Sequence, residues 1–437
     1  MNKLERFVYN RLRQNASLKI KVRNIYQGVF DLLPRPEIKS AYPIIERKGF
    51  FYGFHDHSPF SEDDSKLLAN HASFDLRMPK KNETLEVGFF DGENHMNFNR
   101  IAETRAWNWH MGCKLQWCGN NDKVIFNDHI DGRNVARVID INSSNETILH
   151  DSIGSVSPDG KWAVGYSFAR VNKLMPGYGF TYTVQESDLN VDIPNASGIY
   201  RIDIDSGDKK ELISINDLAS INPLPSMKNT KHFLTHTVIS PDSSKFIFLH
   251  RWVNPGKDIS KRFSRLIVCD IDGNILDIFK TDEMVSHIGW QDSDHVIAYC
   301  RVPIFDDKFV LFKIGSPEES LIFGKSTLTS DGHPSYDKSG RWIVTDTYQD
   351  RMRVQNLVLY DTEMDIRYDI SKIPGSKKFQ SPSPHKHWAC DLHPRWSRNS
   401  NLLCFDAIMQ GERSLCTLDL GNDLLEGNLK YVERRSE

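Results

Sequence analysis

A repeated unit of strands and turns constrains the fold of this chain more than any other feature. Each unit has an apolar run, a polar turn rich in Ser, Pro, Asp and Gly, and a second strongly apolar run. β-Branched and aromatic residues favour strands, and such turns separate them. The seven turns lie at residues 61–65, 118–122, 157–160, 240–244, 291–294, 337–340 and 397–400.

Several units continue with a third and a fourth strand. Residues 199–207 and 266–273 are examples of a third strand that ends in its own turn. Four strands per unit, repeated seven times at a spacing of mostly 40 to 60 residues, are typical of a β-propeller. The one long spacing, between the third and fourth turns, is filled by an insertion around residues 169–195. We therefore predict an all-β fold, a seven-bladed β-propeller over residues 37–437.

Composition argues against several classes of partner. The formal net charge of −3 and the pI near 6.6 give no general attraction to nucleic acid, so we expect none as a partner. The seven cysteines include no CxxC pair that would suggest a zinc knuckle or a redox site. No apolar run approaches the length of a membrane span, and no secretory signal is visible, so the cytoplasm is the expected location.

Residues 1–36 differ from the rest and form a basic leader. Residues 1–35 contain eight Lys or Arg against two acids, with apolar residues interleaved at largely helical spacing. This pattern predicts a basic amphipathic helix. Such a helix either lies on an anionic membrane surface, which would make the protein peripheral to the inner membrane, or docks on its own domain through the apolar stripe. The sequence leaves both alternatives open.

Aligning the repeats places histidines in one register of the first strand. The equivalent positions before the seven turns hold His57, Lys114, Ile153, His236, His287, His333 and His393. The first strand of a propeller blade lines the central channel, so five histidine side chains should converge there. A single strand histidine is more often a structural residue, but five in register indicate a functional pocket.

A second register lies five residues into the second strands. It holds His71, Asp128, Tyr166, His250, Cys300, Asp346 and Asp406. Carboxylates beside imidazoles orient them toward a metal, and such a donor set suits Mn, Zn, Fe or Ni. The alternative is a metal-free pocket for an anionic ligand. In either case we expect the substrate to contact His57, Lys114, Tyr166, Arg170 and Arg301.

Three motifs resemble those of the oligogalacturonate lyases, seven-bladed propellers that cleave unsaturated uronic acid disaccharides. Residues 286–290 (Ser-His-Ile-Gly-Trp) are similar to the family's Thr-His-Glu-Phe-Trp. Residues 391–394 (Asp-Leu-His-Pro) resemble its His-Pro-His-Pro run, and residues 248–252 (Phe-Leu-His-Arg-Trp) resemble a stretch ending in Cys-His-Glu-Gly. The resemblance covers roughly residues 230–410 by motif.

The resemblance implies roles for several residues. His287 and His393 would be ligands of a manganese-type ion, and His250 would stand where the family has its catalytic histidine. The chain departs from the family where Asp391 replaces the first histidine of the final run and Arg251 replaces a glutamate. Together with the histidine register, this gives His287, His333, His393 and Asp391 as the expected ligands of a divalent metal, manganese first.

The leading hypothesis is a metal-assisted lyase that cleaves an acidic oligosaccharide or polysaccharide by β-elimination. The proton next to a uronate carboxylate is weakly acidic, so the enzyme must stabilise an enolate-like anion with a metal and Arg251. A neutral histidine, His250 or His236, would take the proton. One alternative is a glycosyl transferase or hydrolase of envelope polysaccharide assembly, which the basic leader favours. Another is a non-catalytic propeller that binds a glycan or a protein partner.

Overall fold

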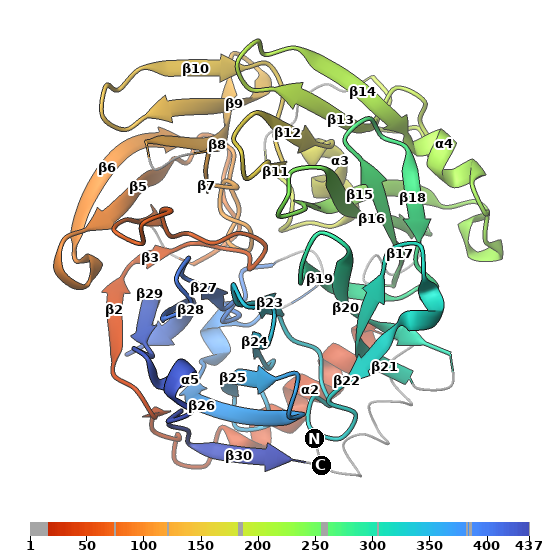
Figure 1. The fold of residues 1–437 in the computed structure, drawn as a ribbon. Coiled ribbons are helices and arrows are strands. Elements are labelled where there is room, and N and C mark those ends of the chain that lie inside the picture. Colours follow the sequence, from red (N-terminus) through yellow and green to blue (C-terminus); the bar gives the residue numbers. More distant parts are fainter. Residues whose placement is uncertain are drawn as a thin grey trace.

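Seven sheets of antiparallel strands stand around a common centre (Figure 1). The computed structural model describes residues 16–73, 76–119, 122–181, 187–254, 261–303, 306–381, 383 and 387–436. Within these ranges the chain passes from one sheet to the next around the ring, as the colours of Figure 1 show. The predicted seven-bladed β-propeller is confirmed.

The first three blades have four strands each, numbered from the channel outward. They are β3 (Phe50–Phe51), β4 (Leu67–His71), β5 (Leu85–Asp91) and β6 (Asn97–Thr104); β7 (Gln116–Trp117), β8 (Lys123–Ile130), β9 (Arg133–Asp140) and β10 (Glu146–Leu149); and β11 (Ser155–Val156), β12 (Trp162–Gly165), β13 (Gly198–Asp203) and β14 (Lys209–Ser214).

The next three blades follow the same order. They are β15 (Lys231–Ile239), β16 (Lys245–Val253), β17 (Arg262–Asp270) and β18 (Ile275–Ile278); β19 (Val285–Trp290), β20 (His295–Val302), β21 (Asp306–Lys313) and β22 (Leu321–Phe323); and β23 (Ser335–Tyr336), β24 (Trp342–Asp346), β25 (Val354–Asp361) and β26 (Ile366–Pro374). Short helices join or flank the strands: α3 (Phe168–Leu174), α4 (Ile215–Ser220), α5 (Asp423–Glu426), η1 (Glu93–His95), η2 (Pro225–Met227), η3 (Pro317–Glu319) and η4 (Lys377–Phe379).

The ring is closed by a strand from the N-terminal part of the chain. The last blade contains β27 (Arg395–Trp396), β28 (Leu402–Met409) and β29 (Glu412–Asp419), and β2 (Ile44–Lys48) pairs with β29 as its outer strand. β1 (Lys39–Ser40) and β30 (Glu433–Ser436) both pair with β26. This closure joins the two ends of the ring and was not predicted from the sequence.

The turn between the first and second strands is built in the same way in several blades. Ser157 Oγ donates to Asp159 Oδ1 over 2.6 Å and accepts a hydrogen bond from the amide of Trp162 at 3.1 Å. Ser240 and Asp242 repeat the first contact at 2.6 Å. Short polar side chains bind nearby backbone in this way, which explains why Ser and Asp mark these turns in the sequence.

The hydrophobic core lies within and between the blades. Consecutive residues of the second strands, such as Phe246, Ile247 and Phe248, are fully buried because both faces of a blade pack on other residues. All seven cysteines are free and buried, and burial raises the pKa of Cys118 to about 11. The thiols therefore serve as apolar packing groups.

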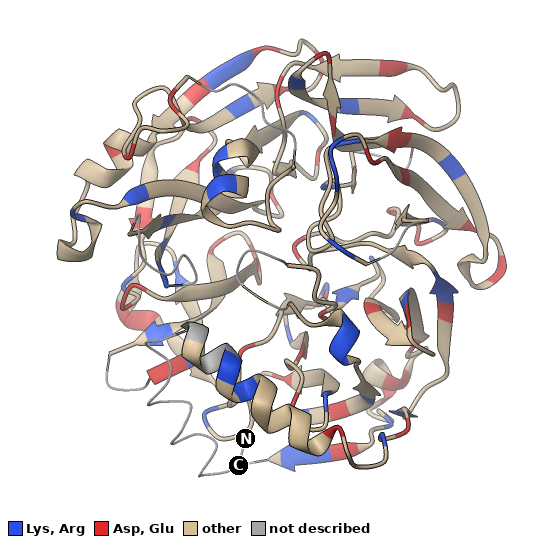
Figure 2. Ribbon diagram, turned by 180° about the vertical axis from the view of Figure 1, so that it is seen from behind, with Lys and Arg blue, Asp and Glu red and all other residues tan. Residues whose placement is uncertain are grey.

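A helix, α2 (Ala16–Phe30), lies on one face of the ring, at the lower left of Figure 2. The amide of Gln27 donates to the carbonyl oxygen of Asp350 at 2.7 Å, and Asp31 pairs with Arg353 at 2.7 Å. The predicted N-terminal helix is therefore present and contacts the loop between β24 and β25. No helix in the described ranges is long and apolar enough to cross a membrane.

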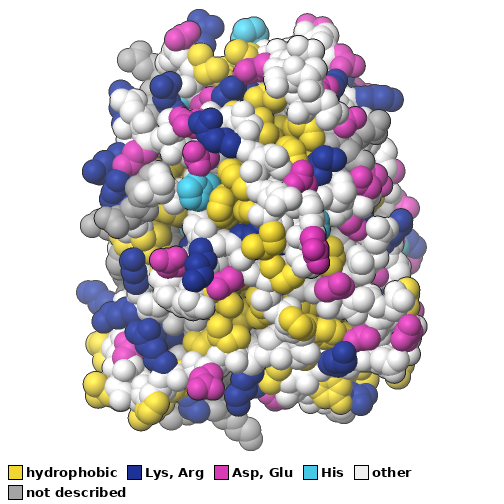
Figure 3. Space-filling model, turned by 90° about the vertical axis from the view of Figure 1, so that its left-hand side faces the viewer, with side chains coloured by type: hydrophobic (Ala, Val, Ile, Leu, Met, Phe, Trp, Pro, Cys, Tyr) yellow, Lys and Arg dark blue, Asp and Glu magenta, His cyan; other side chains and the backbone are white. Residues whose placement is uncertain are grey.

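The outer wall of the ring carries charges of both signs among hydrophobic side chains (Figure 3). Arg137 with Glu146 and Lys313 with Glu319 form surface ion pairs at 2.5 and 2.6 Å. Exposed pairs of this kind contribute little to stability, and a mixed wall is typical of a solvated surface.

Candidate functional site

The phenyl ring of Phe54 is surrounded by imidazole rings at the centre of the propeller. The ring centroids of six histidines lie 4.6 to 6.0 Å from that of Phe54. We call these residues the histidine cluster: His55, His110, His236, His287, His333 and His393.

Four members of the cluster are those that the repeat alignment predicted. His236 lies in β15 and His287 in β19, while His333 and His393 lie two residues before β23 and β27. These are the innermost strands of four consecutive blades. Their imidazoles converge because every blade presents its first strand to the channel.

The backbone in this register adopts an unusual conformation. The φ angle is +57° at His236, +44° at His393 and +58° at Lys114, which holds the same position in the second blade. The pairing register between β15 and β16 also shifts between Thr235 and Val238. Non-glycine residues with positive φ are uncommon and cluster at functional sites. A local bulge, rather than a regular pleat, therefore presents these side chains to the channel.

His55 and His110 belong to the cluster but were not predicted. They lie in the segments that follow β3 and β6, outside the repeated strand pattern. In the first blade the alignment selected His57, whereas the residue that contacts Phe54 is His55, two positions earlier. The short sequence His-Asp-His at residues 55–57 is the signal that could have identified His55.

Two carboxylates orient members of the cluster. His287 Nδ1 lies 2.9 Å from Asp331 Oδ1, and His333 Nδ1 lies 2.7 Å from Asp346 Oδ1. A carboxylate on Nδ1 fixes the tautomer and leaves Nε2 for another partner. Burial raises the pKa of Asp346 to about 7, whereas for Asp331 the contacts with His287 and Ser286 outweigh burial and lower the pKa. Asp346 was part of the predicted second register, and Asp331 was not.

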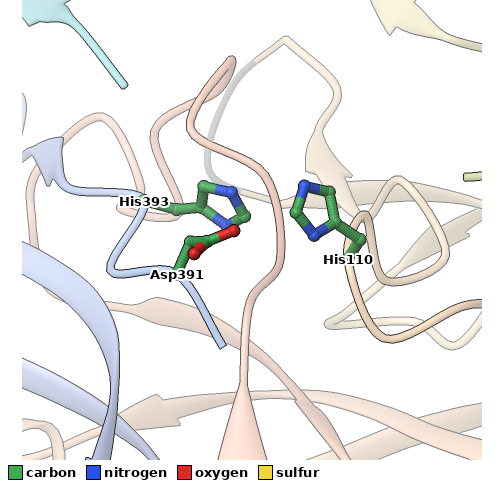
Figure 4. A group of neighbouring side chains, drawn as sticks. All are labelled: His110, Asp391 and His393. Atoms are coloured by element: carbon green, nitrogen blue, oxygen red, sulfur yellow. The ribbon is translucent and has the colours of Figure 1, made fainter. Parts of the chain in front are cut away.

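His110, Asp391 and His393 form a group that could hold a metal ion (Figure 4). One nitrogen or oxygen donor atom from each residue lies within 4.8 Å of the others, and all three residues are buried. Figure 4 shows the two imidazoles and the carboxylate close together, with His110 approaching from the opposite side to the other two. Imidazole nitrogens and a carboxylate oxygen are ligands of Mn, Fe, Ni and Zn.

The two imidazoles of this group are in the neutral state that a divalent cation needs. Within the described part of the chain, both ring nitrogens of His110 and of His393 lack a hydrogen-bond partner. Burial lowers the pKa of both histidines well below the usual value, so both are neutral, and burial raises the pKa of Asp391 to about 7. A cation among them would provide a partner for buried nitrogens and a desolvated carboxylate together. The group therefore fits a divalent metal.

Two of the four predicted metal ligands, Asp391 and His393, belong to this group. The ring centroid of His333 is 4.2 Å from that of His393, and that of His287 is 4.1 Å from that of His333. His287 and His333 therefore line the same pocket beside the group. The third donor, His110, comes from a loop without a repeat signal, which is why sequence reasoning missed it.

Arg251, His236 and Tyr178 lie together beside the cluster. The ring of Tyr178 is 6.0 Å from that of His236 and 4.4 Å from that of His110. Arg251 is buried, its Nε donates to Thr235 Oγ1 at 3.1 Å, and burial lowers the pKa of its guanidinium to about 9. Burial and the charge of Arg251 lower the pKa of His236 well below the usual value. This side of the pocket presents a neutral imidazole next to a positive charge, which suits an anionic ligand.

Lys114 lies in the channel, but a carboxylate neutralises it. Its ammonium group forms a buried ion pair with Asp56, and His57 Nε2 lies 3.8 Å from the same carboxylate. Burial lowers the pKa of His57 to about 4, so this imidazole is neutral. Lys114 and His57 line a small cavity together with Phe54. The charge that Lys114 was expected to offer a substrate is therefore already paired.

The structure does not bring His250 to the cluster. His250 Nε2 contacts His232 Nδ1 at 2.9 Å, and its Nδ1 accepts a hydrogen bond from Arg265 at 3.2 Å. Successive side chains of a strand point to opposite faces, so His250 and Arg251 cannot both face the same pocket. Arg251 has the pocket position, and both ring nitrogens of the buried His250 are engaged. The prediction of His250 as the base is therefore corrected to a structural role.

Three other predicted substrate residues also have structural partners. Arg170 is buried in α3 and donates to backbone carbonyl oxygens, including that of His232 at 2.5 Å. Arg301 pairs with Asp307 at 2.8 Å across β20 and β21. Tyr166 is buried and stacks on Phe168 with ring centroids 4.6 Å apart. The structure does not place these three among the members of the histidine cluster.

Two carboxylates of the second register bind backbone amides rather than histidines. Asp128 accepts a hydrogen bond from the amide of Arg105 at 2.8 Å, and Asp406 accepts one from the amide of Tyr52 at 3.0 Å. Each also pairs with an arginine of the adjacent strand at 3.0 or 2.9 Å. These residues tie neighbouring blades together, so the second register is mainly structural.

Comparisons with known proteins were made on sequence and on structure. No family model and no curated protein matches the sequence. Among solved structures, an oligogalacturonate lyase in complex with manganese matches with a TM-score of 0.59 and 14% identity, covering 90% of this chain and 100% of that chain. The chain has the fold of that lyase. An oligogalacturonate lyase from Vibrio parahaemolyticus matches with a TM-score of 0.57 and 12% identity, covering 89% of this chain and 100% of that chain. The predicted resemblance is confirmed, and at these identities it concerns the fold.

Proposed function

We propose that this chain is a metal-assisted lyase that cleaves a uronate-containing oligosaccharide or polysaccharide by β-elimination. One observation carries the proposal. A buried His-Asp-His group, a neutral histidine and a buried arginine lie together at the centre of the propeller. β-Elimination next to a carboxylate needs an acceptor for the proton and positive charge for the anion that forms. The likeness in fold to oligogalacturonate lyases supports the same reaction class.

Arg251 would bind the carboxylate of the uronate. A guanidinium pairs with a carboxylate through two parallel hydrogen bonds, which fixes the sugar as well as its charge. Arg251 is buried beside the cluster, where its charge acts strongly because little water screens it. The same contact stabilises the enolate-like anion as the proton leaves.

His236 would be the base. It takes the proton from the carbon next to the carboxylate, the bond between the neighbouring carbon and the glycosidic oxygen breaks, and a carbon–carbon double bond forms. His236 is suited to this step because its lowered pKa keeps it neutral and its Nδ1 lacks a hydrogen-bond partner in the described part of the chain. General bases of this kind typically contribute about 10² to 10⁴ in rate.

Tyr178 would donate a proton to the leaving glycosidic oxygen. Burial raises the pKa of its phenol well above the usual value, so the hydroxyl stays protonated. The ring lies between those of His110 and His236, at 4.4 and 6.0 Å. Tyr178 is therefore near both the proposed base and the metal group.

His110, Asp391 and His393 would hold the divalent metal, with His333 and His287 beside them. Bound there, the ion would supply Lewis-acid stabilisation of the substrate carboxylate. We propose manganese because the donors are nitrogen and oxygen and because the similar lyase structure is a manganese complex.

The test is an assay of the purified chain with manganese on a panel of uronate-containing oligosaccharides and polysaccharides. We expect new ultraviolet absorbance from a conjugated double bond, and we expect His236→Gln to lower kcat by about 10² or more. His250→Gln is the matched control: it should lower stability and retain kcat per folded molecule.

Three outcomes would contradict the proposal. Cleavage that yields saturated ends would indicate a hydrolase, and sugar transfer without cleavage would indicate a transferase. Binding of glycans without turnover, unchanged in His236→Gln, would indicate a non-catalytic propeller.

A further inference from the structure

The helix α2 contacts the propeller through polar side chains. Gln27 is 1% exposed, and its side-chain oxygen accepts a hydrogen bond from Gln380 Nε2 at 2.9 Å. One residue past the helix, Asp31 accepts hydrogen bonds from Arg353 at 2.7 and 3.0 Å. An amphipathic helix on the surface of a globular protein normally turns its apolar stripe toward the core. Here polar residues make the hydrogen bonds to the rest of the protein, and Phe30 adds a contact of its ring with the guanidinium of Arg351 at 5.4 Å.

One row of apolar side chains in this segment is exposed. Leu18, Ile25 and Val29 are 43%, 72% and 62% exposed, and their spacing places them along one side of the helix. Leu32, just past the helix, is 86% exposed and extends the row. Contiguous exposed apolar residues mark interaction sites. We call these four residues the apolar stripe.

Basic residues flank the apolar stripe. Lys21 on the helix and Arg35 after it are exposed, and residues 1–35 contain eight Lys or Arg against two acids. One of the two acids, Asp31, is already paired with Arg353. The segment is therefore strongly basic in a chain whose formal net charge is −3. An apolar stripe bordered by Lys and Arg is complementary to the interface of an anionic bilayer, where charged headgroups lie above acyl chains.

The helix lies on the face of the ring that carries the loop after β24, next to the histidine cluster. Asp346, which binds His333, is the last residue of β24, and the loop that follows it holds Asp350 and Arg353 under the helix. Arg23 lies one turn before Gln27, on the side of the helix that faces the ring. Figure 2 shows α2 in front of the strands on this face.

We infer that α2 is a membrane-docking helix that binds an anionic lipid surface through the apolar stripe and its basic neighbours. The stripe enters the boundary between headgroups and acyl chains, and Lys21 and Arg35 contact anionic headgroups. Docking in this orientation turns the face of the ring that carries α2 toward the bilayer. The pocket then meets glycans held at the membrane surface, a consequence that rests on the proposed function, whereas lipid binding itself does not.

The test is sedimentation of the full chain with vesicles of phosphatidylglycerol and phosphatidylcholine, compared with phosphatidylcholine alone. We expect binding to the anionic vesicles that weakens at high salt. Ile25→Ser with Val29→Ser should weaken it at least about tenfold, since two buried apolar side chains are lost. Lys21→Glu with Arg35→Glu should weaken it as well. Leu425→Ser, at a 90% exposed position of α5, is the matched control and should bind as the parent does.

Three results would overturn the inference. The first is an absence of sedimentation with anionic vesicles, and the second is equal binding by the Ile25→Ser, Val29→Ser variant. The third is a concentration-dependent dimer in ultracentrifugation that this variant abolishes, with no binding to vesicles, because the stripe would then be covered by a second copy of the chain. The assay uses no glycan, so its failure leaves the proposed lyase reaction standing, and a failed lyase assay leaves lipid binding standing.

Discussion

Asp346 binds the imidazole of His333 and also binds the backbone of the next blade. One carboxylate oxygen accepts hydrogen bonds from His333 Nδ1 at 2.7 Å and from the His333 amide at 3.0 Å. The other oxygen accepts a hydrogen bond from the amide of His393 in the next blade at 3.1 Å. The ring centroids of the two histidines are 4.2 Å apart. A single buried carboxylate therefore sets the position of both imidazoles.

Asp346→Asn should weaken metal binding and activity, because the new amide group cannot accept hydrogen bonds on both of its ends. Partners that orient metal-site histidines are typically worth about 10- to 100-fold in affinity or activity. The measurements are manganese titration by calorimetry and the lyase assay. Asp128→Asn is the control, since Asp128 binds the amide of Arg105 and the side chain of Arg137. An equal loss of metal affinity in both variants would argue against the role of Asp346.

Added manganese should raise the melting temperature of the parent protein, and His110→Ala should abolish this shift. A ligand that binds only the folded state at 100 times its Kd stabilises it by about 2.7 kcal/mol. His57→Ala should keep the shift, because His57 lies beside Asp56 and not in the metal group. If His110→Ala still responds to manganese, the ligands have been misassigned.

Stability should fall as the pH drops from about 6.5 toward about 4. Burial lowers the pKa of His57 and His232 to about 4, so the folded state binds fewer protons than the unfolded chain in this range. Each such histidine costs about 1.4 kcal/mol per pH unit. Asp346 and Asp391, whose pKa burial raises to about 7, take up protons in the same range and offset part of the loss.

Urea unfolding at several pH values measures this dependence. The buried histidines outnumber the two carboxyl groups, so we expect a net loss of stability on acidification. A free energy of unfolding that stays constant or increases from neutral pH to about 4.5 would contradict the neutral state assigned to these histidines.

Arg251→Gln should lower kcat/KM on uronate substrates by at least about tenfold, which corresponds to about 1.4 kcal/mol. Arg251→Lys should recover only part of the loss, because an ammonium group cannot make the two parallel hydrogen bonds of a guanidinium. A methyl-esterified substrate should lose its dependence on this residue. Arg301→Gln, whose partner is Asp307, serves as the control and should leave kcat/KM unchanged. An unchanged kcat/KM in Arg251→Gln would remove Arg251 from the site.

The repeated strands made the fold and four of the six histidines of the cluster predictable from sequence. In a propeller, equivalent positions of successive blades lie at equivalent places around the channel, so aligning the turns also aligned His236, His287, His333 and His393. The same alignment failed in the first blade, where His55 rather than His57 reaches Phe54.

The remaining site residues lie in segments that do not follow the repeated strand pattern. His110 and Tyr178 come from irregular segments, and their positions depend on how those loops fold back over the channel. His250 and Arg251 are adjacent in β16, and the motif at residues 248–252 does not indicate which of the two side chains faces the pocket. A shift of one residue along a strand reverses the face, so a resemblance in three or four letters does not fix such a choice. The leader's helix was predictable, but the side through which it docks was not.

The pairing of β2 with β29 has a consequence for the order of synthesis. The partner of Ile44–Lys48 is Glu412–Asp419, so the outer strand of the last blade waits unpaired until nearly the whole chain has been made. The six earlier blades can assemble on the ribosome, but the ring cannot lock before then. If α2 binds a membrane during that interval, the unfinished propeller is held at the bilayer by this helix. The ring then closes while it is already bound there.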